Sequence, residues 1–274
     1  MQACIFVGLL HFQNCKFYYV VVEYFNNMKF PNFNEEKKLW KKGYKFVAGL
    51  DEAGRGPLAG PVVAVAVIIR SYNKKHSDIM QNVRMFLGVR DSKKLSEKQR
   101  EYFYKILTNH PQIKWGIGIV SEKVIDKINI LEATKLAMRK SLDSLNFSFK
   151  LKKATLQNYS SFPRKAGIVF FLIDGNFKLG GCRTSSQLNQ KSIIKGDQKV
   201  FSIAAASIIA KVTRDRIMRK MHKKYPKYGF DRHKGYGTVL HIKNLRDFGP
   251  CPIHRITFAK VLPKSNLSDR VESI

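Results

Sequence analysis

Cysteine is scarce in this chain of 274 residues. Its four cysteines are too few and too scattered for the framework of a small disulfide-stapled secreted protein: Cys4, Cys15, Cys182 and Cys251. The sequence therefore favours a reducing, cytoplasmic setting. It also lacks the glycine signatures of P-loop and dinucleotide-binding proteins, so no nucleotide cofactor is expected.

Acidic residues are also few. Twenty Asp and Glu stand against 50 Lys and Arg, which gives a formal net charge of +30. Such an excess favours a polyanionic partner such as nucleic acid or an anionic membrane surface. A lysine-rich but otherwise ordinary surface is the alternative, and composition does not separate the two. Because 44% of the residues are apolar, the chain can bury a core, which excludes wholesale disorder.

The first 27 residues carry only two charges, Lys16 and Glu23. They lack the basic start of a signal peptide, and polar residues interrupt the run of about 20 apolar residues that a membrane span needs. Met28 then begins a more ordinary sequence. We therefore expect residues 1–27 to be an over-extended reading of the gene and Met28 to be the start. A short membrane or partner anchor is the alternative.

Beyond Met28 there is no repeat, linker or low-complexity block, which predicts a single domain over 28–274 with a core at about 44–258. Continuous apolar runs predict strands at 44–50, 61–69, 115–120 and 168–173. Helical spacing predicts helices at 96–107, 130–145 and 203–225, with a helical, basic region from about 215. Strands interleaved with helices indicate an α/β fold. Two polar stretches, 146–165 and 177–192, are expected to be surface loops.

The segment 51–60 joins two of the predicted strands. It opens on the adjacent acids Asp51 and Glu52 and contains three glycines, Gly54, Gly56 and Gly60. Glycine lets a ligand approach the backbone closely, and Arg55 offers a planar fork for phosphate. Because adjacent strand residues face opposite ways, the two acids converge only where the strand bends or ends. A polar hairpin turn is the alternative.

Two further acids follow predicted elements. Asp174 ends the fourth apolar strand, and Asp197 stands just before the long alanine-rich helix. Each alone fits a helix cap or a turn better than a ligand. Together with Asp51 and Glu52, however, they indicate oxygen ligation of a hard cation such as Mg²⁺. Paired ions of this kind about 4 Å apart are the usual device for phosphodiester hydrolysis.

These segments resemble the ordered sequence blocks of the ribonuclease HII family. The resemblance covers about 44–258 and rests on blocks at 51–62, 91–96, 129–138, 173–176, 195–197, 205–215 and 233–238. It implies an RNase H-like fold, with a mixed central sheet flanked by helices. It also implies an endonuclease that cuts the RNA strand of RNA–DNA hybrids and incises 5′ to single ribonucleotides in duplex DNA, leaving 5′-phosphate and 3′-hydroxyl ends.

The resemblance also implies residue roles. The catalytic, metal-binding acids would be Asp51, Glu52, Asp174 and Asp197, holding two Mg²⁺ or Mn²⁺ ions. The substrate-binding residues would be Gly54, Arg55 and Gly56 at the ribose 2′-hydroxyl, Tyr236 at the ribonucleotide–deoxyribonucleotide junction, and Lys93, Lys94, Ser207 and Lys211. Lys93 and Lys94 could instead simply solubilise a loop, and Ser207 could be a buried helix residue.

The basic run, the cysteine–histidine pair and the C-terminal tail each allow more than one interpretation. The basic run 211–234 is expected to follow the duplex backbone, although such runs are usually solvated faces. Cys251 and His254 could bind zinc with Cys182 or His233, but no zinc-type spacing supports this. The tail 259–274 lacks a sliding-clamp motif, so a monomer without clamp docking is expected. Two rival interpretations are weighed. One is ribonuclease HIII, a related family with a sizeable additional N-terminal domain, and the other is a catalytically silent hybrid-binding protein.

Overall fold

The computed structural model describes residues 30–44, 46–70, 88–148, 169–180 and 189–261. Its helices and strands all belong to one compact unit, Pro31–Ile274. The expected over-extended segment 1–27 lies outside the described residues, as does the expected 146–165 loop from residue 149 on. Residues 146–148 of that expected loop are the end of a helix instead.

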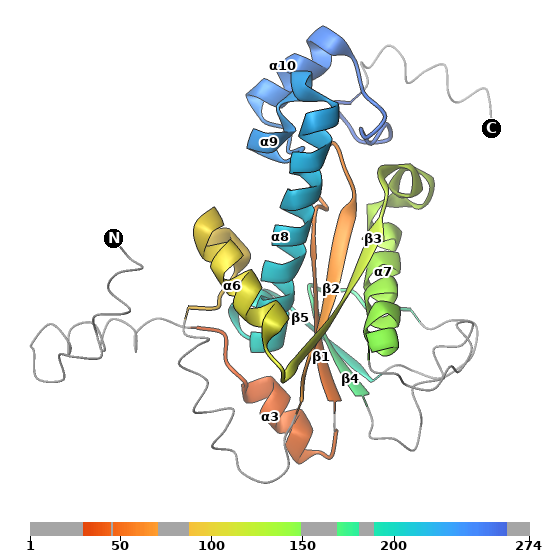
Figure 1. Ribbon diagram of the computed structural model, residues 1–274. Coiled ribbons are helices and arrows are strands. Elements are labelled where there is room, and N and C mark those ends of the chain that lie inside the picture. The colour runs from red at the N-terminus through yellow and green to blue at the C-terminus, as the bar shows by residue number, and fades with distance from the viewer. Residues whose placement is uncertain (1–29, 45, 71–87, 149–168, 181–188, 262–274) are drawn as a thin grey trace, which may run out of the picture. The chain divides into compact units, whose positions relative to one another are not determined.

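The described residues form strands, α-helices and short 3-10 turns (Figure 1). The strands are β1 (Phe46–Ala53), β2 (Val62–Arg70), β3 (Ile113–Val120), β4 (Val169–Asp174) and β5 (Gln190–Ile193). The α-helices are α3 (Asn34–Lys41), α6 (Glu97–Asn109), α7 (Glu122–Ser148), α8 (Phe201–Lys224), α9 (Phe230–His233) and α10 (Val239–Phe248). Short 3-10 turns are η2 (Ser92–Lys94), η4 (Gly196–Gln198) and η5 (Pro226–Tyr228).

The strands form a mixed sheet in the order β3-β2-β1-β4-β5. β1 pairs antiparallel with β2, and β2 pairs antiparallel with β3. β4 runs parallel to both β1 and β5. Since β1 and β4 are neighbouring parallel strands, their carboxyl ends meet at the same edge of the sheet.

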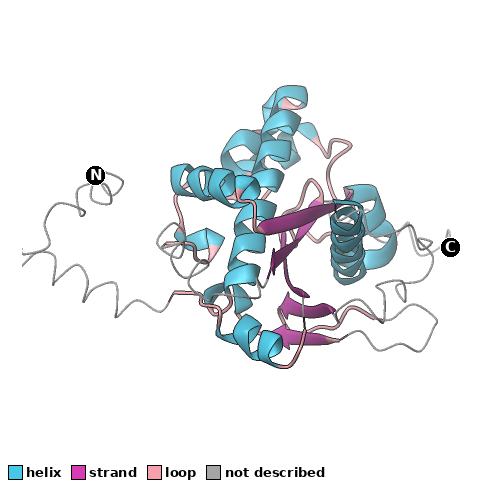
Figure 2. Ribbon diagram, turned by 60° about the horizontal axis from the view of Figure 1, so that its bottom comes forward, coloured by secondary structure: helices cyan, strands magenta, loops and turns pink. Residues whose placement is uncertain are grey.

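Helices cover both faces of this sheet, as Figures 1 and 2 show. Successive residues of β2 point to opposite sides, so Val65 and Val67 pack in the cluster that contains α8 and α6, while Ala64 and Ala66 pack with α7. β2 is therefore buried on both faces, which explains its continuous apolar run. The predicted α/β class, with a mixed central sheet flanked by helices, is confirmed.

Helix α8 lies unusually close to β1. Gly49 faces it, and a Cβ at this position would lie 2.4 Å from the backbone carbon of Ser202. Only glycine therefore permits this approach, which brings the α8 side chains next to the end of β1. The first half of α8 is apolar and buried on every side. The bounds of α8 agree with the predicted helix 203–225 to within two residues.

Helix α7 is broken at Asn129, whose φ of 63° and ψ of 167° are not helical. The Oδ1 atom of Asn129 accepts hydrogen bonds from the N–H groups of Leu131 and Glu132, at 2.9 and 3.1 Å. This side chain therefore caps the second segment of α7. The helix predicted from residue 130 begins at this cap, whereas the segment before the break was not predicted.

Two elements, α3 and β5, have no counterpart in the sequence prediction. Both are short and mostly polar: α3 has only two apolar residues, Leu39 and Trp40, and β5 has only Ile193, so neither contains an apolar run. β5 overturns the expectation that 177–192 is entirely a surface loop. It pairs with β4, and the side chain of Gln190 both donates to and accepts from the backbone of Leu179, at 3.1 and 2.9 Å. Tertiary hydrogen bonds, and not a pattern of apolar side chains, hold this strand in the sheet.

The helical C-terminal region is confirmed in α8, α9 and α10. α8 runs past residue 215 to Lys224, and α10 begins at the cap Thr238, whose Oγ1 accepts from the N–H of His241. Among the helices of the described ranges, none has the length and apolar character that crossing a membrane would require.

Candidate active site at the carboxyl ends of β1 and β4

Asp51 and Glu52 lie within β1 and not beyond its end. The strand continues to Ala53, so the two side chains point to opposite faces of the sheet. Asp51 stands opposite Val65, on the α8 side, and Glu52 opposite Ala64, on the α7 side. The sequence predicts that Asp51 and Glu52 converge only if the strand bends or ends there. The strand instead continues through both residues.

Asp174 and Asp197 are brought to the same edge. Asp51 and Asp174 each follow the last pair of the β1–β4 ladder, Leu50 and Ile173. The Oδ1 atom of Asp174 accepts a hydrogen bond of 2.7 Å from the N–H of Gly196, the residue before Asp197. This bond thus ties Asp174 to the residue that precedes Asp197, although the two acids are 23 positions apart in the sequence.

The four acids form one electrostatic group. Burial, Glu52 and Asp174 raise the pKa of Asp51 well above its ordinary value. Burial raises the pKa of Glu52 to about 7, although Arg55, with Nη1 3.5 Å from Oε1, opposes the rise. Burial, Asp91 and Asp174 raise the pKa of Asp197 to about 6. The negative charges lie close enough to disfavour one another, as at sites that bind cations.

Asp91 is a fifth acid at this group and is itself buried, and sequence reasoning missed it as a site residue. Its Oδ1 caps η2 by accepting from the N–H of Lys93, at 2.9 Å, and its Oδ2 accepts from Nε2 of Gln198. Burial lowers the pKa of Lys93, but Asp91, Asp197 and Asp51 outweigh it and raise the pKa. Lys93 therefore belongs to the acidic group electrostatically, and both Lys93 and its neighbour Lys94 are exposed. The sequence signal that could have identified Asp91 is its position as the first residue of the 91–96 sequence block.

The donor set suits a hard divalent cation. All the acids offer carboxylate oxygen, and Oε2 of Glu52 is buried with no hydrogen-bond partner among the described residues. Within the same residues, no three His, Cys, Asp or Glu side chains are arranged as a ready-made metal site. One oxygen each of Asp51 and Asp174 is engaged with a backbone N–H, of Glu52 and Gly196 respectively. Because an ionised carboxylate has about four lone-pair sites, these bonds leave acceptor oxygen on both acids for a cation.

The glycine-containing turn follows the acids directly. Gly54 has a φ of +101°, and a Cβ there would lie 2.1 Å from Nε of Arg214, so no other residue fits without displacement. Arg55 and Gly56 are exposed. The ring of Tyr236 faces the turn: a Cβ on Gly56 would lie 3.9 Å from its Cε1. The predicted substrate-binding residues Gly54, Arg55, Gly56 and Tyr236 are thus brought together.

Ser207 and Lys211 lie on α8 beside these groups. Ser207 is buried, and its hydroxyl lies 3.0 Å from Oγ of Ser92; this hydroxyl also partly offsets the rise in the pKa of Asp51. Lys211 pairs with Asp215 at 2.8 Å and lies 5.7 Å from the centroid of the Tyr236 ring. Ser207 thus influences Asp51 and Lys211 lies near Tyr236, and neither side chain is freely exposed to solvent.

The basic run 211–234 is only partly available to a duplex backbone. Arg214 is fully buried and donates to the carbonyl oxygens of Ala59, Pro61 and Lys234, each at 3.0 Å. Arg216 and Arg219 pair with acids of α6. The expectation that the run as a whole faces a duplex is therefore wrong for Arg214, while the charges of Arg216 and Arg219 are partly neutralised. A buried arginine inside a basic run gives no sequence signal of its burial.

Three histidines lie beneath Tyr236. His241 Nδ1 is 2.9 Å from the carbonyl oxygen of Tyr236, and His241 Nε2 is 3.0 Å from His254 Nε2. His254 Nδ1 accepts from the N–H of Cys251, and His233 Nδ1 accepts from that of Gly235. Burial lowers the pKa of all three, that of His254 to about 4. The residues weighed as zinc ligands are here hydrogen-bonded to one another or to backbone, and Cys182 lies outside the described residues.

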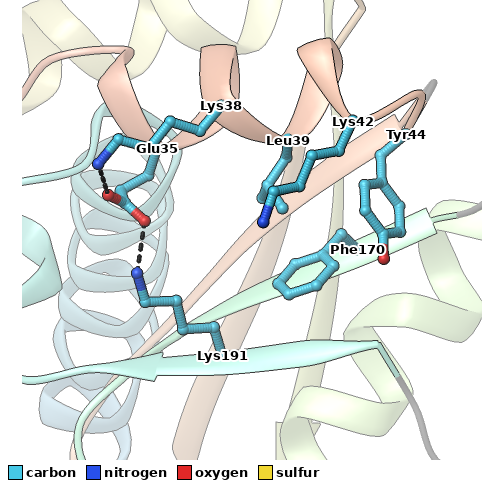
Figure 3. A pocket seen from close by; sticks show the side chains of 7 residues that line it. All are labelled: Glu35, Lys38, Leu39, Lys42, Tyr44, Phe170 and Lys191. Atoms are coloured by element: carbon cyan, nitrogen blue, oxygen red, sulfur yellow. Dashed lines mark hydrogen bonds and ion pairs between the residues drawn. The ribbon is translucent and has the colours of Figure 1, made fainter.

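A cavity of about 190 Å³ lies away from the acids, near the start of β1 (Figure 3). Leu39, Tyr44 and Phe170 form its apolar wall. Lys38 and Lys191 point toward Glu35 and pair with it, at 2.9 and 2.6 Å. Because its carboxylate is already neutralised by these lysines, the cavity adds nothing to the acidic group.

Comparison with known proteins agrees with the sequence blocks. Residues 48–261 match the family profile described as Ribonuclease HII. The chain is 47% identical over 226 residues to the protein named Ribonuclease HII of Chlamydia muridarum, covering 82% of this chain and 88% of that protein. The crystal structure of ribonuclease H2 from Pyrococcus horikoshii is 26% identical, with a TM-score of 0.53, covering 79% and 95% of the two chains.

A second structure, Bst-RNase HIII in complex with Mn²⁺, shares the fold at 17% identity and a TM-score of 0.58, over 80% of this chain and 68% of that one. The profile match and the curated relative decide between the two families. This chain belongs to the ribonuclease HII family and is a hydrolase of the ribonuclease H type.

Proposed function

We propose that the protein cuts the RNA strand of RNA–DNA hybrids and also incises duplex DNA 5′ to a single embedded ribonucleotide. One observation carries this proposal. A group of mutually repelling buried acids lies next to an exposed, glycine-containing turn that faces an exposed tyrosine. The acids suit phosphodiester hydrolysis, and the turn offers main-chain donors to the ribose 2′-hydroxyl, the local feature that separates RNA from DNA.

Asp51, Glu52, Asp174 and Asp197 would hold two divalent ions, Mg²⁺ or Mn²⁺. When bound, such a pair supplies an activated water and neutralises charge on the leaving oxygen. The unpartnered Oε2 of Glu52 and the raised pKa values support this assignment, since both mark negative charge that lacks a counterion. Asp91 would keep Lys93 and Gln198 in place around the acids.

The remaining residues would bind substrate. Lys93 lies among the acids, where an ammonium group would meet the scissile phosphate, and the exposed Lys94 would meet a neighbouring phosphate. Tyr236 would pack against the sugar and base at the junction, supported from below by Arg214 and Lys211. Ser207 would act on substrate only indirectly, by orienting Asp51.

The decisive experiment uses three duplexes of the same sequence: all DNA, DNA with one ribonucleotide, and an RNA–DNA hybrid. We expect Mg²⁺- or Mn²⁺-dependent cleavage of the last two, with a cut 5′ to the single ribonucleotide, and no cleavage of plain DNA or in EDTA. Tight hybrid binding without cleavage under any metal would instead support the catalytically silent alternative. Cleavage of the hybrid alone would reject the single-ribonucleotide activity.

Metal binding should stabilise the fold more strongly at high pH. The pKa of Glu52 is raised from 4.5 to about 7 and that of Asp197 from 3.8 to about 6, so the metal-free protein loses stability as pH rises through this window. The rise at Glu52 alone corresponds to about 3 kcal/mol. Divalent ions bind the ionised acids and offset this loss.

We therefore expect Mn²⁺ to raise the melting temperature by a few degrees more at pH 8 than at pH 5, measured by thermal unfolding. The variant Asp143→Asn, which changes an acid on α7 outside the group, should respond as the wild type does. An equal Mn²⁺ effect at both pH values would contradict the assignment of the acids as ligands.

A further inference from the structure

Arg255 is a buried cation whose side-chain hydrogen bonds, among the described residues, all go to backbone carbonyl groups of one loop. It is fully buried, and its Nη2 donates to the carbonyl oxygens of Gly54 and Gly60, at 2.6 and 2.8 Å. Its Nη1 donates to that of Arg55, at 3.0 Å, and its Nε to that of Gly60, at 2.9 Å. Among the described residues no acid forms an ion pair with it. Burial and Arg214 lower its pKa to about 9, so it remains charged at neutral pH.

These contacts set the direction of two peptide groups. In a trans peptide the C=O and the following N–H point opposite ways. Because Arg255 draws the carbonyl oxygens of Gly54 and Arg55 inward, the N–H groups of Arg55 and Gly56 point away from it. Neither N–H donates to an acceptor in the described part of the chain, and both residues are exposed. Two unsatisfied donors are therefore presented side by side at the surface next to the acids.

Arg255 is itself held firmly in place. Its N–H donates to the carbonyl oxygen of Leu58, at 2.9 Å. Asp126 of α7 accepts from the N–H groups of Ile256 and Thr257, both at 3.0 Å. The ring of Phe258 covers the guanidinium at 5.0 Å. The segment 255–258 thus ties the turn to α7 and the sheet, so the two donors are oriented before any substrate arrives.

We propose that Arg255 is a positioning residue for ribonucleotide recognition, which holds the N–H groups of Arg55 and Gly56 outward as paired donors to the ribose 2′-hydroxyl. This inference rests on the proposed reading of that hydroxyl by the 54–56 turn. A guanidinium suits the task because its planar fork reaches successive carbonyl groups at once, which a lysine ammonium cannot do in the same geometry.

The test compares Arg255→Lys with wild type, using Arg216→Lys on the surface of α8 as the matched control. Cleavage of a labelled duplex with one ribonucleotide gives kcat and KM. Inhibition of that cleavage by an unlabelled all-DNA duplex gives Ki, which reports binding through phosphates alone. For Arg255→Lys we expect KM to rise by about tenfold or more, while Ki stays within about twofold of the wild-type value. The control should change neither quantity.

Each failure has a distinct signature. If wild-type KM and Ki are equal, the protein does not read the 2′-hydroxyl, and the proposed function fails at that point. If wild type prefers the ribonucleotide and Arg255→Lys keeps that preference, only the role of Arg255 is overturned. An equal rise of KM and Ki in Arg255→Lys also overturns it, because general loosening of the fold weakens both.

A second variant covers the case in which Arg255→Lys does not fold, as judged by circular dichroism. Phe258→Leu removes the ring over the guanidinium and leaves every carbonyl contact of Arg255 chemically possible. We expect a smaller loss of ribonucleotide preference, about threefold, from a less firmly held guanidinium. An unchanged KM-to-Ki ratio in this variant would overturn the proposal.

Discussion

Replacing Asp51 by asparagine should abolish metal-dependent cleavage and at the same time stabilise the metal-free protein. The substitution keeps the shape of the side chain and its acceptor for the N–H of Glu52, but it removes a buried negative charge. A carboxylate ligand contributes several kcal/mol to transition-state stabilisation through its ion, which corresponds to a loss of about 10³-fold or more in kcat.

The gain in stability has the opposite origin. Burial and two neighbouring acids, Glu52 and Asp174, raise the pKa of Asp51 well above its ordinary value, so its ionised form is unfavourable in the folded state. We expect Asp51→Asn to raise the melting temperature in EDTA at pH 8 by about 3–6 °C, corresponding to 1–2 kcal/mol. Asp143→Asn is the control and should leave cleavage unchanged.

The two readouts separate the possible roles of Asp51. Full activity in Asp51→Asn would remove it from the set of catalytic residues. Loss of activity together with a lower melting temperature would show that its charge supports the fold. Only lost activity with gained stability agrees with a group of acids whose repulsion is relieved by divalent ions. The buried acids then destabilise the metal-free wild-type fold, and they are kept because cleavage requires them.

The parts of the fold that sequence predicts are those with a strong hydrophobic pattern. β2 is buried on both faces and reads as an uninterrupted apolar run, so its position follows from the sequence alone. β5 is an edge strand of four mostly polar residues. It forms because it pairs with β4 and because the side chain of Gln190 is hydrogen-bonded to the backbone of Leu179. No local pattern encodes such a partner.

The same contrast holds for the candidate site. Asp174 ends β4 and Asp197 stands just before α8, in a chain poor in acids, and this placement makes both visible in the sequence. Arg214 and Arg255 are hidden among 50 Lys and Arg, the class of residue least often buried. Their burial follows from carbonyl groups of the loop at 54–61, more than 150 positions earlier in the chain, that only the tertiary fold brings near.

Net charge also has a different meaning once the structure is known. Arg216 and Arg219 pair with Glu97 and Glu101 across the α6–α8 contact, so part of the positive charge holds two helices together. These pairs are partly exposed and contribute modestly to stability. The electrostatic attraction for a polyanion must therefore come from the other lysines and arginines, and a count of charges along 211–234 overstates it.

Removing the ring of Tyr236 should impair cutting at a single ribonucleotide far more than it impairs folding. The side chain is 41% exposed and lies over Arg214 and Lys211, with the turn at Gly56 beside it. A base or sugar stacked on an aromatic ring is worth about 1–3 kcal/mol, so kcat/KM for the single-ribonucleotide duplex should fall by about 10- to 100-fold in Tyr236→Ala. Because Arg214 is held by three carbonyl groups and not by the ring, the melting temperature should change little.

Two further variants define the cause of that loss. Tyr236→Phe keeps the ring and should keep most of the activity, since stacking does not need the hydroxyl. Tyr102→Ala removes an exposed tyrosine of α6, 62% exposed, and should leave kcat/KM unchanged. An unfolded Tyr236→Ala would make the ring a structural element. Wild-type kcat/KM in a folded Tyr236→Ala would remove Tyr236 from the substrate-binding surface, because a ring beside the turn cannot contact the junction without contributing to its binding.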